Sequence, residues 1–252
     1  MRTKVLLVAA IIALAVPAMA SFSGGTFYWK DSGGTYHQFD AQSKVKLPKA
    51  PGPGTSGGPF CVTWISGAPL PEWEHKSPGD VLFKTWCVES DITFNPNRTY
   101  WATVDPYAYS GGGGGIAPGM DPISEVTRGI YEVWRSGGPW SGSQLNDIKK
   151  AIWFAEEEPG GPGAMPAWVK TAVEGYLGYA LPASVSDFDG LPGGLDALNL
   201  WDGFVEEDVP GLGLVWVAKD RQSHLYVIPV PGAALLGVLG LGLVSRLRRR
   251  LG

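Results

Sequence analysis

The chain has 252 residues, with 20 Lys and Arg against 24 Asp and Glu and a formal net charge of −4. Six of the 20 basic residues lie at the two ends, which leaves 14 against 24 acidic residues between them, a formal −10. A surface this acidic disfavours nucleic acid and anionic membrane surfaces as partners.

Glycine, proline and tryptophan are abundant, with 36, 21 and 11 residues. This mixture is typical of many short strands joined by tight turns, with large aromatic side chains in the core. The stretch 21–228 is long enough to form one domain with a sizeable core.

Residues 1–20 have the pattern of a secretory signal peptide. Two basic residues precede an apolar run over 5–16, and the small residues Ala18 and Ala20 stand before Ser21. Small residues in this spacing form a cleavage site of the A-x-A type. We therefore expect export, with a mature chain that starts at Ser21.

Alternating, β-branched and aromatic segments predict short strands on both sides of a central helical region. These segments are 26–29, 60–65, 80–88, 98–104, 195–201, 213–218 and 223–228. The Gly- and Pro-rich segments 41–58 and 67–79 predict loops. The turn Asn95-Pro96-Asn97 predicts a hairpin of 80–88 with 98–104, and the last two segments predict a second hairpin.

The helical region predicts three helices with apolar stripes at a period of 3.6 residues. The first begins near Asp121-Pro122 and ends at Gly137, the second begins near Ser143 and is stopped by Pro159-Gly160, and the third begins at Pro166 and ends before Pro182. The third is expected to bury Val169, Val173, Tyr176, Leu177 and Ala180. The predicted fold is therefore a single secreted α+β domain over 21–228, with an antiparallel sheet or sandwich and an inserted block of about three helices.

The tail, 229–252, predicts a hydrophobic helix that targets the membrane. Pro229, Val230 and Pro231 precede an apolar run of about thirteen residues over 232–244, whereas a full span needs roughly 20. An arginine cluster follows, and its charge favours the cytoplasmic side. The cluster consists of Arg246, Arg248, Arg249 and Arg250. A simple C-terminal anchor is one interpretation of this pattern.

This order of a proline motif, a short apolar helix and an arginine cluster resembles the PEP-CTERM sorting signal of exported bacterial proteins. That family usually has Val-Pro-Glu-Pro where this chain has Ile228-Pro229-Val230-Pro231. The resemblance implies that the export machinery and an exosortase-like membrane protease are partners. It also implies a transient membrane anchor, followed by delivery to the cell surface or the extracellular matrix.

Two short segments of the body, Trp86 to Glu89 and Lys149 to Phe154, resemble a group of PEP-CTERM proteins with a Phe-Cys-Val-Glu segment and a Gln-x-Ala-Ile-Trp helix. More distantly they are similar to thioester domains of surface adhesins, in which a cysteine sulfur bonds to a glutamine carbonyl. Cys87 takes the cysteine position and Lys149 takes the glutamine position. Because lysine has no side-chain carbonyl, the resemblance implies a chemically silent copy. We expect Lys149 to face solvent or a carboxylate such as Glu89.

The two cysteines, Cys61 and Cys87, predict one disulfide in an oxidising compartment. No metal site or cofactor is predicted: the segment 187–190 has the opening spacing of a calcium loop, but its twelfth position is Leu198 rather than glutamate. The run 156–158 of three glutamates is expected to be solvated. The three histidines have no ligand spacing.

These patterns favour a non-enzymatic exported module of the cell surface or extracellular matrix, with an extracellular polysaccharide or a protein as its contact. No catalytic residue is predicted. An extracellular hydrolase acting on matrix polysaccharide is the alternative, and an acidic cleft lined by tryptophans would favour it. A third hypothesis is an adhesin that has lost its thioester chemistry.

Overall fold

The structure is a computed structural model that describes residues 25–30, 33–41, 43–54, 56, 58–90, 95–109, 121–158, 161–182, 195–220 and 223–226. The predicted signal peptide with its cleavage residues Ala18, Ala20 and Ser21 lies outside the described residues. So do the segment 187–190 and the tail from Pro229 to Arg250.

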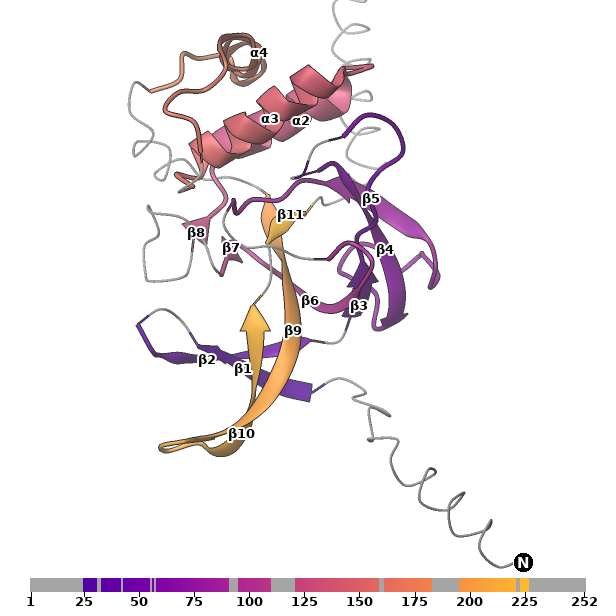
Figure 1. Ribbon diagram of the computed structural model, residues 1–252, viewed down its shortest axis with the longest axis vertical. Coiled ribbons are helices and arrows are strands. Elements are labelled where there is room, and N and C mark those ends of the chain that lie inside the picture. Colours follow the sequence, from indigo (N-terminus) through magenta and orange to yellow (C-terminus); the bar gives the residue numbers. More distant parts are fainter. Residues whose placement is uncertain are drawn as a thin grey trace, which may run out of the picture.

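The described residues form an α+β fold with a large mixed sheet and three helices at one end of it (Figure 1). The strands of the sheet are β1 (Gly25–Lys30), β2 (Tyr36–Ala41), β3 (Ser43–Lys46), β4 (Phe60–Gly67), β5 (Val81–Thr85), β6 (Thr99–Asp105), β9 (Asp196–Val209), β10 (Gly213–Asp220) and β11 (His224–Tyr226). A separate pair is formed by β7 (Tyr107–Ala108) and β8 (Asp121–Pro122), and the helices are α2 (Glu125–Ser136), α3 (Gly142–Ala155) and α4 (Ala167–Leu177).

The sheet order is β2-β1-β10-β9-β6-β3-β4-β5, with β11 paired to the beginning of β9. The 14-residue strand β9 organises this sheet, because it pairs with β11 and β6 along its first half and with β10 along its second half. The β1–β10 pair is parallel, so the sheet is mixed rather than purely antiparallel as predicted.

Both predicted hairpins are wrong. Strand β5 pairs with β4, whereas β6 lies between β3 and β9. Strands β10 and β11 do not pair with each other, because each pairs with β9. The segment 41–58 is also not simply a loop, since Ser43–Lys46 forms the inner strand β3.

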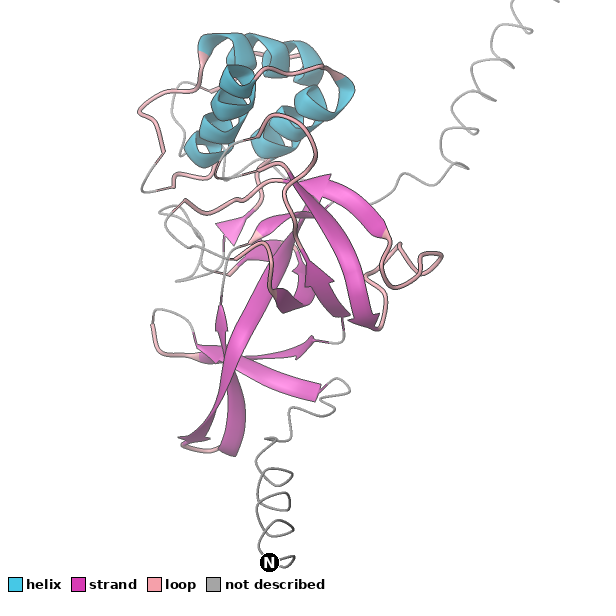
Figure 2. Cartoon of the chain, turned by 45° about the vertical axis from the view of Figure 1, so that its right-hand side comes forward, coloured by secondary structure: helices cyan, strands magenta, loops and turns pink. Residues whose placement is uncertain are grey.

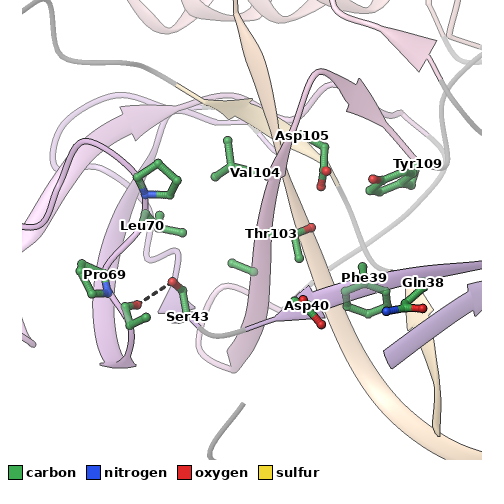
Figure 3. Close-up of a pocket in the computed structure, with 13 residues that line it drawn as sticks. Gln38, Phe39, Asp40, Ser43, Pro69, Leu70, Thr103, Val104, Asp105 and Tyr109 are labelled. Atoms are coloured by element: carbon green, nitrogen blue, oxygen red, sulfur yellow. Dashed lines mark hydrogen bonds between the residues drawn. The ribbon is translucent and has the colours of Figure 1, made fainter. Parts of the chain in front are cut away.

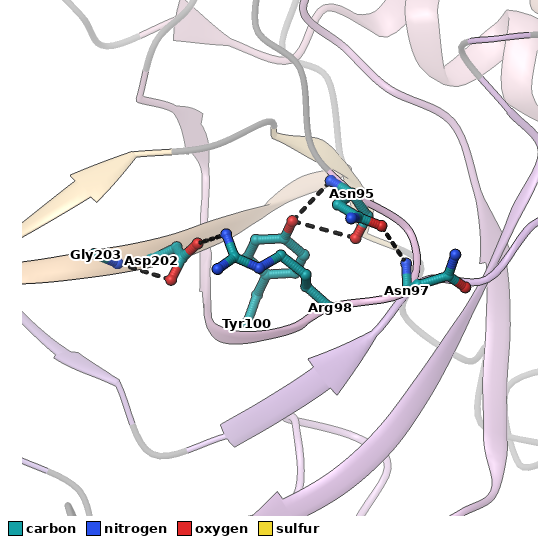
Figure 4. Close-up of polar contacts among 6 residues, drawn as sticks. All are labelled: Asn95, Asn97, Arg98, Tyr100, Asp202 and Gly203. Carbon is teal, nitrogen blue, oxygen red and sulfur yellow. Dashed lines mark hydrogen bonds and ion pairs between the residues drawn. The ribbon is translucent and has the colours of Figure 1, made fainter. Parts of the chain in front are cut away.

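The predicted turn before β6 is present, and hydrogen bonds hold it (Figure 4). The Asn95 side chain accepts a bond from the Asn97 N–H at 2.9 Å, and the Tyr100 hydroxyl donates to the Asn95 carbonyl at 3.2 Å. Arg98 then reaches across to Asp202 on β9 at 2.9 Å. The turn therefore directs β6 toward β9 rather than back along β5.

The helices begin where polar caps satisfy their first N–H groups. Ser124 caps α2, so the predicted start near Asp121-Pro122 is wrong, because those residues form β8. Ser141 forms a capping box with Gln144 at the start of α3. Gly137 ends α2 as predicted. In α4, Val169 and Val173 are buried as expected, but Tyr176 and Ala180 are exposed.

Figure 2 shows the helices gathered at one end and the strands extending away from them. Three groups of buried side chains follow this division. The helical cluster combines α2, α3 and α4 with strand residues such as Trp86 and Leu225. A second cluster lies between β3, β4, β5 and β6. The aromatic cluster lies at the β1–β2 end and is built on Phe27, Trp29, Phe39 and Trp201.

Candidate functional site

Cys87 lies directly after β5, in a segment that continues the sheet. Its neighbours exchange backbone hydrogen bonds with the start of β11: Val88 N–H donates to the Ser223 carbonyl at 3.0 Å, and Leu225 N–H donates to the Trp86 carbonyl at 3.1 Å. Cys87 and His224 face each other across this bridge. Both side chains are buried.

The buried environment suppresses ionisation of both groups. Burial raises the pKa of the Cys87 thiol well above its ordinary value, and the charge of Glu89 raises it further. Burial also lowers the pKa of His224 from 6.5 to about 3. Since the thiolate is the reactive form of cysteine, the pairing of Cys87 with His224 does not produce an activated nucleophile.

The structure brings Cys87 and Lys149 close enough to influence each other's ionisation. The Lys149 ammonium partly offsets the rise in the Cys87 pKa. The pKa of Lys149 is itself lowered by burial and then by Lys150, with Cys87 acting in the opposite direction. The two positions that the thioester resemblance pairs are thus neighbours in space, and lysine supplies no carbonyl for a thioester.

Lys149 does not pair with Glu89, and that expectation is wrong. Its ammonium donates to the Ser56 hydroxyl at 3.3 Å and lies 4.6 Å from the centre of the Trp153 ring. The Glu89 carboxylate instead accepts a hydrogen bond from the Ser223 N–H at 2.7 Å. Lys149 is largely buried, so it does not face open solvent either.

The predicted Cys61–Cys87 disulfide is not formed in the structure, in which both cysteines are buried and reduced. Phe60 and Val62 pack in the same cluster as Cys87. Because successive residues of a strand point to opposite faces, Cys61 between them points away from Cys87. The two sulfurs therefore lie on different faces of the sheet.

The glutamate run at the end of α3 is not a solvated run, because Glu156 and Glu158 are buried. Glu156 follows buried Ile152 by four residues and so continues the buried face of α3. Glu158 lies one residue after Glu157, where the chain takes a positive φ of 52°. Glu156 accepts hydrogen bonds from the hydroxyls of Ser124, at 3.0 Å, and Thr127. Burial, followed by the charge of Asp121, raises its pKa from 4.5 to about 8.

A cavity of about 330 Å³ lies beside β6, between the β2–β3 corner and the loop before β5 (Figure 3). Asp105 and Tyr109 lie close together on one side of it, and Asp40 lies below them. On the opposite side Pro69 and Leu70 supply an apolar wall. The cavity thus combines carboxylates with ring and apolar surfaces.

Strand pairing explains why the cavity lies at this point. Strand β3 pairs with β6 only from Thr99 to Ala102, and the next residues of β6 line the cavity. Ser43, the first residue of β3, closes the corner by donating from its hydroxyl to the Ala68 carbonyl at 2.6 Å. The cavity therefore opens where β3 no longer accompanies β6.

The polar groups of the cavity are only partly satisfied by the protein. Asp105 Oδ2 is buried and has no hydrogen-bond partner among the described residues. The Thr103 hydroxyl accepts a bond from Trp201 Nε1 at 3.0 Å, which leaves its own proton to donate. Burial raises the pKa of Tyr109, and the charge of Asp105 raises it further, so its phenol stays protonated.

Within the described residues no helix is both long and apolar enough to cross a bilayer. Nor do three or more His, Cys, Asp or Glu side chains gather there into a possible metal site. Comparison of the chain with protein-family models, with curated proteins and with solved structures finds no match.

Sequence reasoning did not identify the cavity residues. Asp40 and Asp105 are single carboxylates at strand ends, and neither belongs to a recognisable spacing pattern. The only signal was that Asp105 directly follows the predicted strand 98–104, and this position did not indicate which other segments would lie next to it.

Proposed function

We propose that this chain is an exported, non-catalytic module of the cell surface or extracellular matrix that binds an extracellular polysaccharide. One observation carries the proposal: the same chain combines the signal-peptide pattern before Ser21 with a Pro-Val-Pro motif, an apolar run and an arginine cluster at its other end. An exosortase-like membrane protease would process the tail, and the body would then be released to the matrix.

The chemistry of the cavity supports a carbohydrate contact. Sugar recognition needs acceptors and donors for hydroxyl groups together with apolar surface for the ring faces. Asp40, Asp105 and Thr103 supply the polar groups, while Phe39 and Tyr109 supply rings. A pocket with mixed walls and a few convergent polar groups is the usual form of a small-molecule site.

Intact mass of the protein exported by its natural host tests the processing. We expect a mass that starts at Ser21 and ends near Pro229. A mass that retains Arg250 would make the tail a permanent anchor and contradict the sorting proposal. Retention of the polysaccharide by the purified mature protein, measured in a pull-down with the host's insoluble matrix, tests the binding.

The alternative function, a hydrolase acting on matrix polysaccharide, has one observation in its favour: Asp40 and Asp105 line the same cavity. Glycosidases use two carboxyl groups roughly 5–10 Å apart as acid and as base or nucleophile. Release of new reducing ends from the matrix by the wild type, and its loss in both Asp40→Asn and Asp105→Asn, would establish this function instead. Binding without release is the result we expect.

A further inference from the structure

We propose that the cavity beside β6 binds a sugar unit that carries a free, protonated amino group, such as a de-N-acetylated hexosamine residue of a matrix polysaccharide. This inference rests on the proposed polysaccharide binding and specifies which polysaccharide would be chosen. It comes from the charge of the cavity walls and from one carboxylate oxygen that the described protein does not satisfy.

The cavity walls carry negative charge only. Two carboxylates, from Asp40 and Asp105, line the cavity, and the described residues that line it include no Lys, Arg or His. A third carboxyl, Asp196, lies close enough that Asp105 raises its pKa, in addition to the effect of burial. An ammonium group would be attracted by these walls and would neutralise charge on Asp105, whereas a neutral ligand would not.

Asp105 is the expected contact for the ammonium. A hydrogen bond joins its carboxyl group to Tyr109, but its buried Oδ2 atom has no hydrogen-bond partner among the described residues. A buried carboxylate oxygen without a donor is costly, and a charge-assisted bond from N⁺–H is among the strongest that could satisfy it. Asp40 is exposed at the end of β2, so it lies at the mouth of the cavity and attracts the same charge from outside.

The remaining walls favour a sugar over a simple amine. The Thr103 hydroxyl has a proton to donate after accepting the bond from Trp201, and the exposed Gln38 amide can both donate and accept. These groups match ring hydroxyls rather than an alkyl chain. The volume of about 330 Å³ is at the lower end of the roughly 300–1,000 Å³ of small-molecule sites, which fits one sugar unit.

The test uses the mature exported protein and calorimetric titration, with EDTA present, against four probes. The probes are a hexamer of β-1,4-linked glucosamine, its fully N-acetylated counterpart, the glucose hexamer of the same linkage and a lysine hexapeptide. We expect the glucosamine hexamer to bind at least tenfold more tightly than each of the others. We also expect Asp105→Asn to weaken its binding at least tenfold, and Asp40→Asn to weaken it less.

Asp208→Asn is the matched control, because it removes the same charge from an exposed position on β9; it should leave the affinity unchanged. If all three variants weaken binding equally, the ligand responds only to the net charge of the protein, and the proposed binding site is wrong. Tight binding of the lysine peptide would overturn the choice of a sugar.

The failures of the two proposals are distinguishable. If a neutral hexamer binds as tightly as the glucosamine hexamer and Asp105→Asn abolishes both, the amine inference fails while polysaccharide binding at the cavity stands. If no hexamer binds, and the mature protein is also not retained by host matrix, both proposals fail. Binding of the glucosamine hexamer that is unaffected by Asp105→Asn would place the site elsewhere and overturn the inference.

Discussion

The helical end and the aromatic end of the molecule bury carboxylates in opposite ways. At the helical end, Glu156 is enclosed and accepts hydrogen bonds from Ser124 and Thr127. At the end of β6, next to the aromatic cluster, Asp105 borders a cavity with an unpartnered oxygen among the described residues. The same chemical group therefore stabilises the fold at one end and is available to a ligand at the other.

The packing of the two ends differs as well. Aliphatic side chains such as Ile130, Ile148 and Ile152 fill the helical cluster. In the aromatic cluster Trp201 stacks on Phe39 with ring centres 4.2 Å apart and lies 5.4 Å from Tyr109, which borders the cavity. These packed rings hold the cavity wall in position. At the helical end, by contrast, the polar side chain of Glu156 is enclosed and hydrogen-bonded by the protein itself.

The largest expected effect comes from removing the centre of the aromatic cluster. Trp201→Ala deletes a fully buried ring and the donor to Thr103. Such truncations cost about 3–5 kcal/mol. Urea unfolding followed by circular dichroism measures the loss. Trp216→Ala, on the exposed part of β10, is the control and should cost about 1 kcal/mol or less; similar losses in the two variants would show that the aromatic cluster does not hold this end together.

The next prediction concerns the buried carboxyl of the helical end. Because the pKa of Glu156 is raised from 4.5 to about 8, the folded protein keeps a proton that the unfolded chain releases between these values. This contribution to stability is present below pH 4.5 and is lost as the pH rises through 8, at up to about 1.4 kcal/mol per pH unit. Glu156→Gln removes the titration but keeps a hydrogen-bonding side chain. Relative to wild type, its free energy of unfolding should therefore increase steadily from pH 5 to pH 8.

Glu157→Gln is the control for this titration, since it changes the adjacent glutamate. We expect Glu156→Gln to show a larger pH-dependent gain over wild type than Glu157→Gln. A pH-independent difference for Glu156→Gln would mean that its carboxyl is already ionised in the folded protein and that the helical end tolerates a buried charge.

Thr103→Val tests the link between the aromatic cluster and the cavity. The variant keeps the shape of the side chain but leaves the buried Trp201 Nε1 without its acceptor. An unsatisfied buried donor costs about 1–3 kcal/mol. Thr171→Val, at an exposed position of α4, makes the same change without burial and should cost clearly less. Equal costs, measured by thermal unfolding of both variants, would contradict the importance of this hydrogen bond.

Local signals predicted the helical end well. The end of α2 at Gly137 and the buried faces of α2 and α3 follow from short-range features, whereas the cap predicted at Asp121-Pro122 is wrong because Ser124 caps α2. The burial of Glu156 was missed because three successive glutamates are typical of a solvated run, although Glu156 lies four residues after buried Ile152 on the same face of α3. The burial of Glu158 lies beyond the end of the helix, where helical spacing no longer predicts it. Strand β3 was missed because two of its four residues are lysines, which are typical of loops. In the structure the Lys44 ammonium lies 4.3 Å from the centre of the Trp101 ring on the neighbouring strand β6.

The order of the strands and the cavity lay beyond sequence reasoning for a different reason. Neighbours in the sheet such as β1 and β10, or β3 and β6, are far apart in the chain, and no local pattern specifies such pairs. The cavity is built from residues 38–40, 43, 68–71, 102–105 and 109, which meet only because β6 lies beside both β3 and β9. Until those strand pairings are known, nothing indicates that Asp40 and Asp105 line the same cavity.

The smallest effect is expected for Lys149→Met, which tests the polar contact next to Cys87. The ammonium donates to Ser56 and lies over the Trp153 ring, and a cation–π contact of this kind contributes about 0.5–1 kcal/mol. Methionine keeps most of the apolar stem, and it removes a charge whose pKa is already lowered by burial. We therefore expect a loss of at most about 1 kcal/mol in urea unfolding, with Lys150→Met as the neighbouring control. A loss several times larger would reveal an ionic partner for Lys149 and give the Cys87 region a charge-dependent role like that of the cavity.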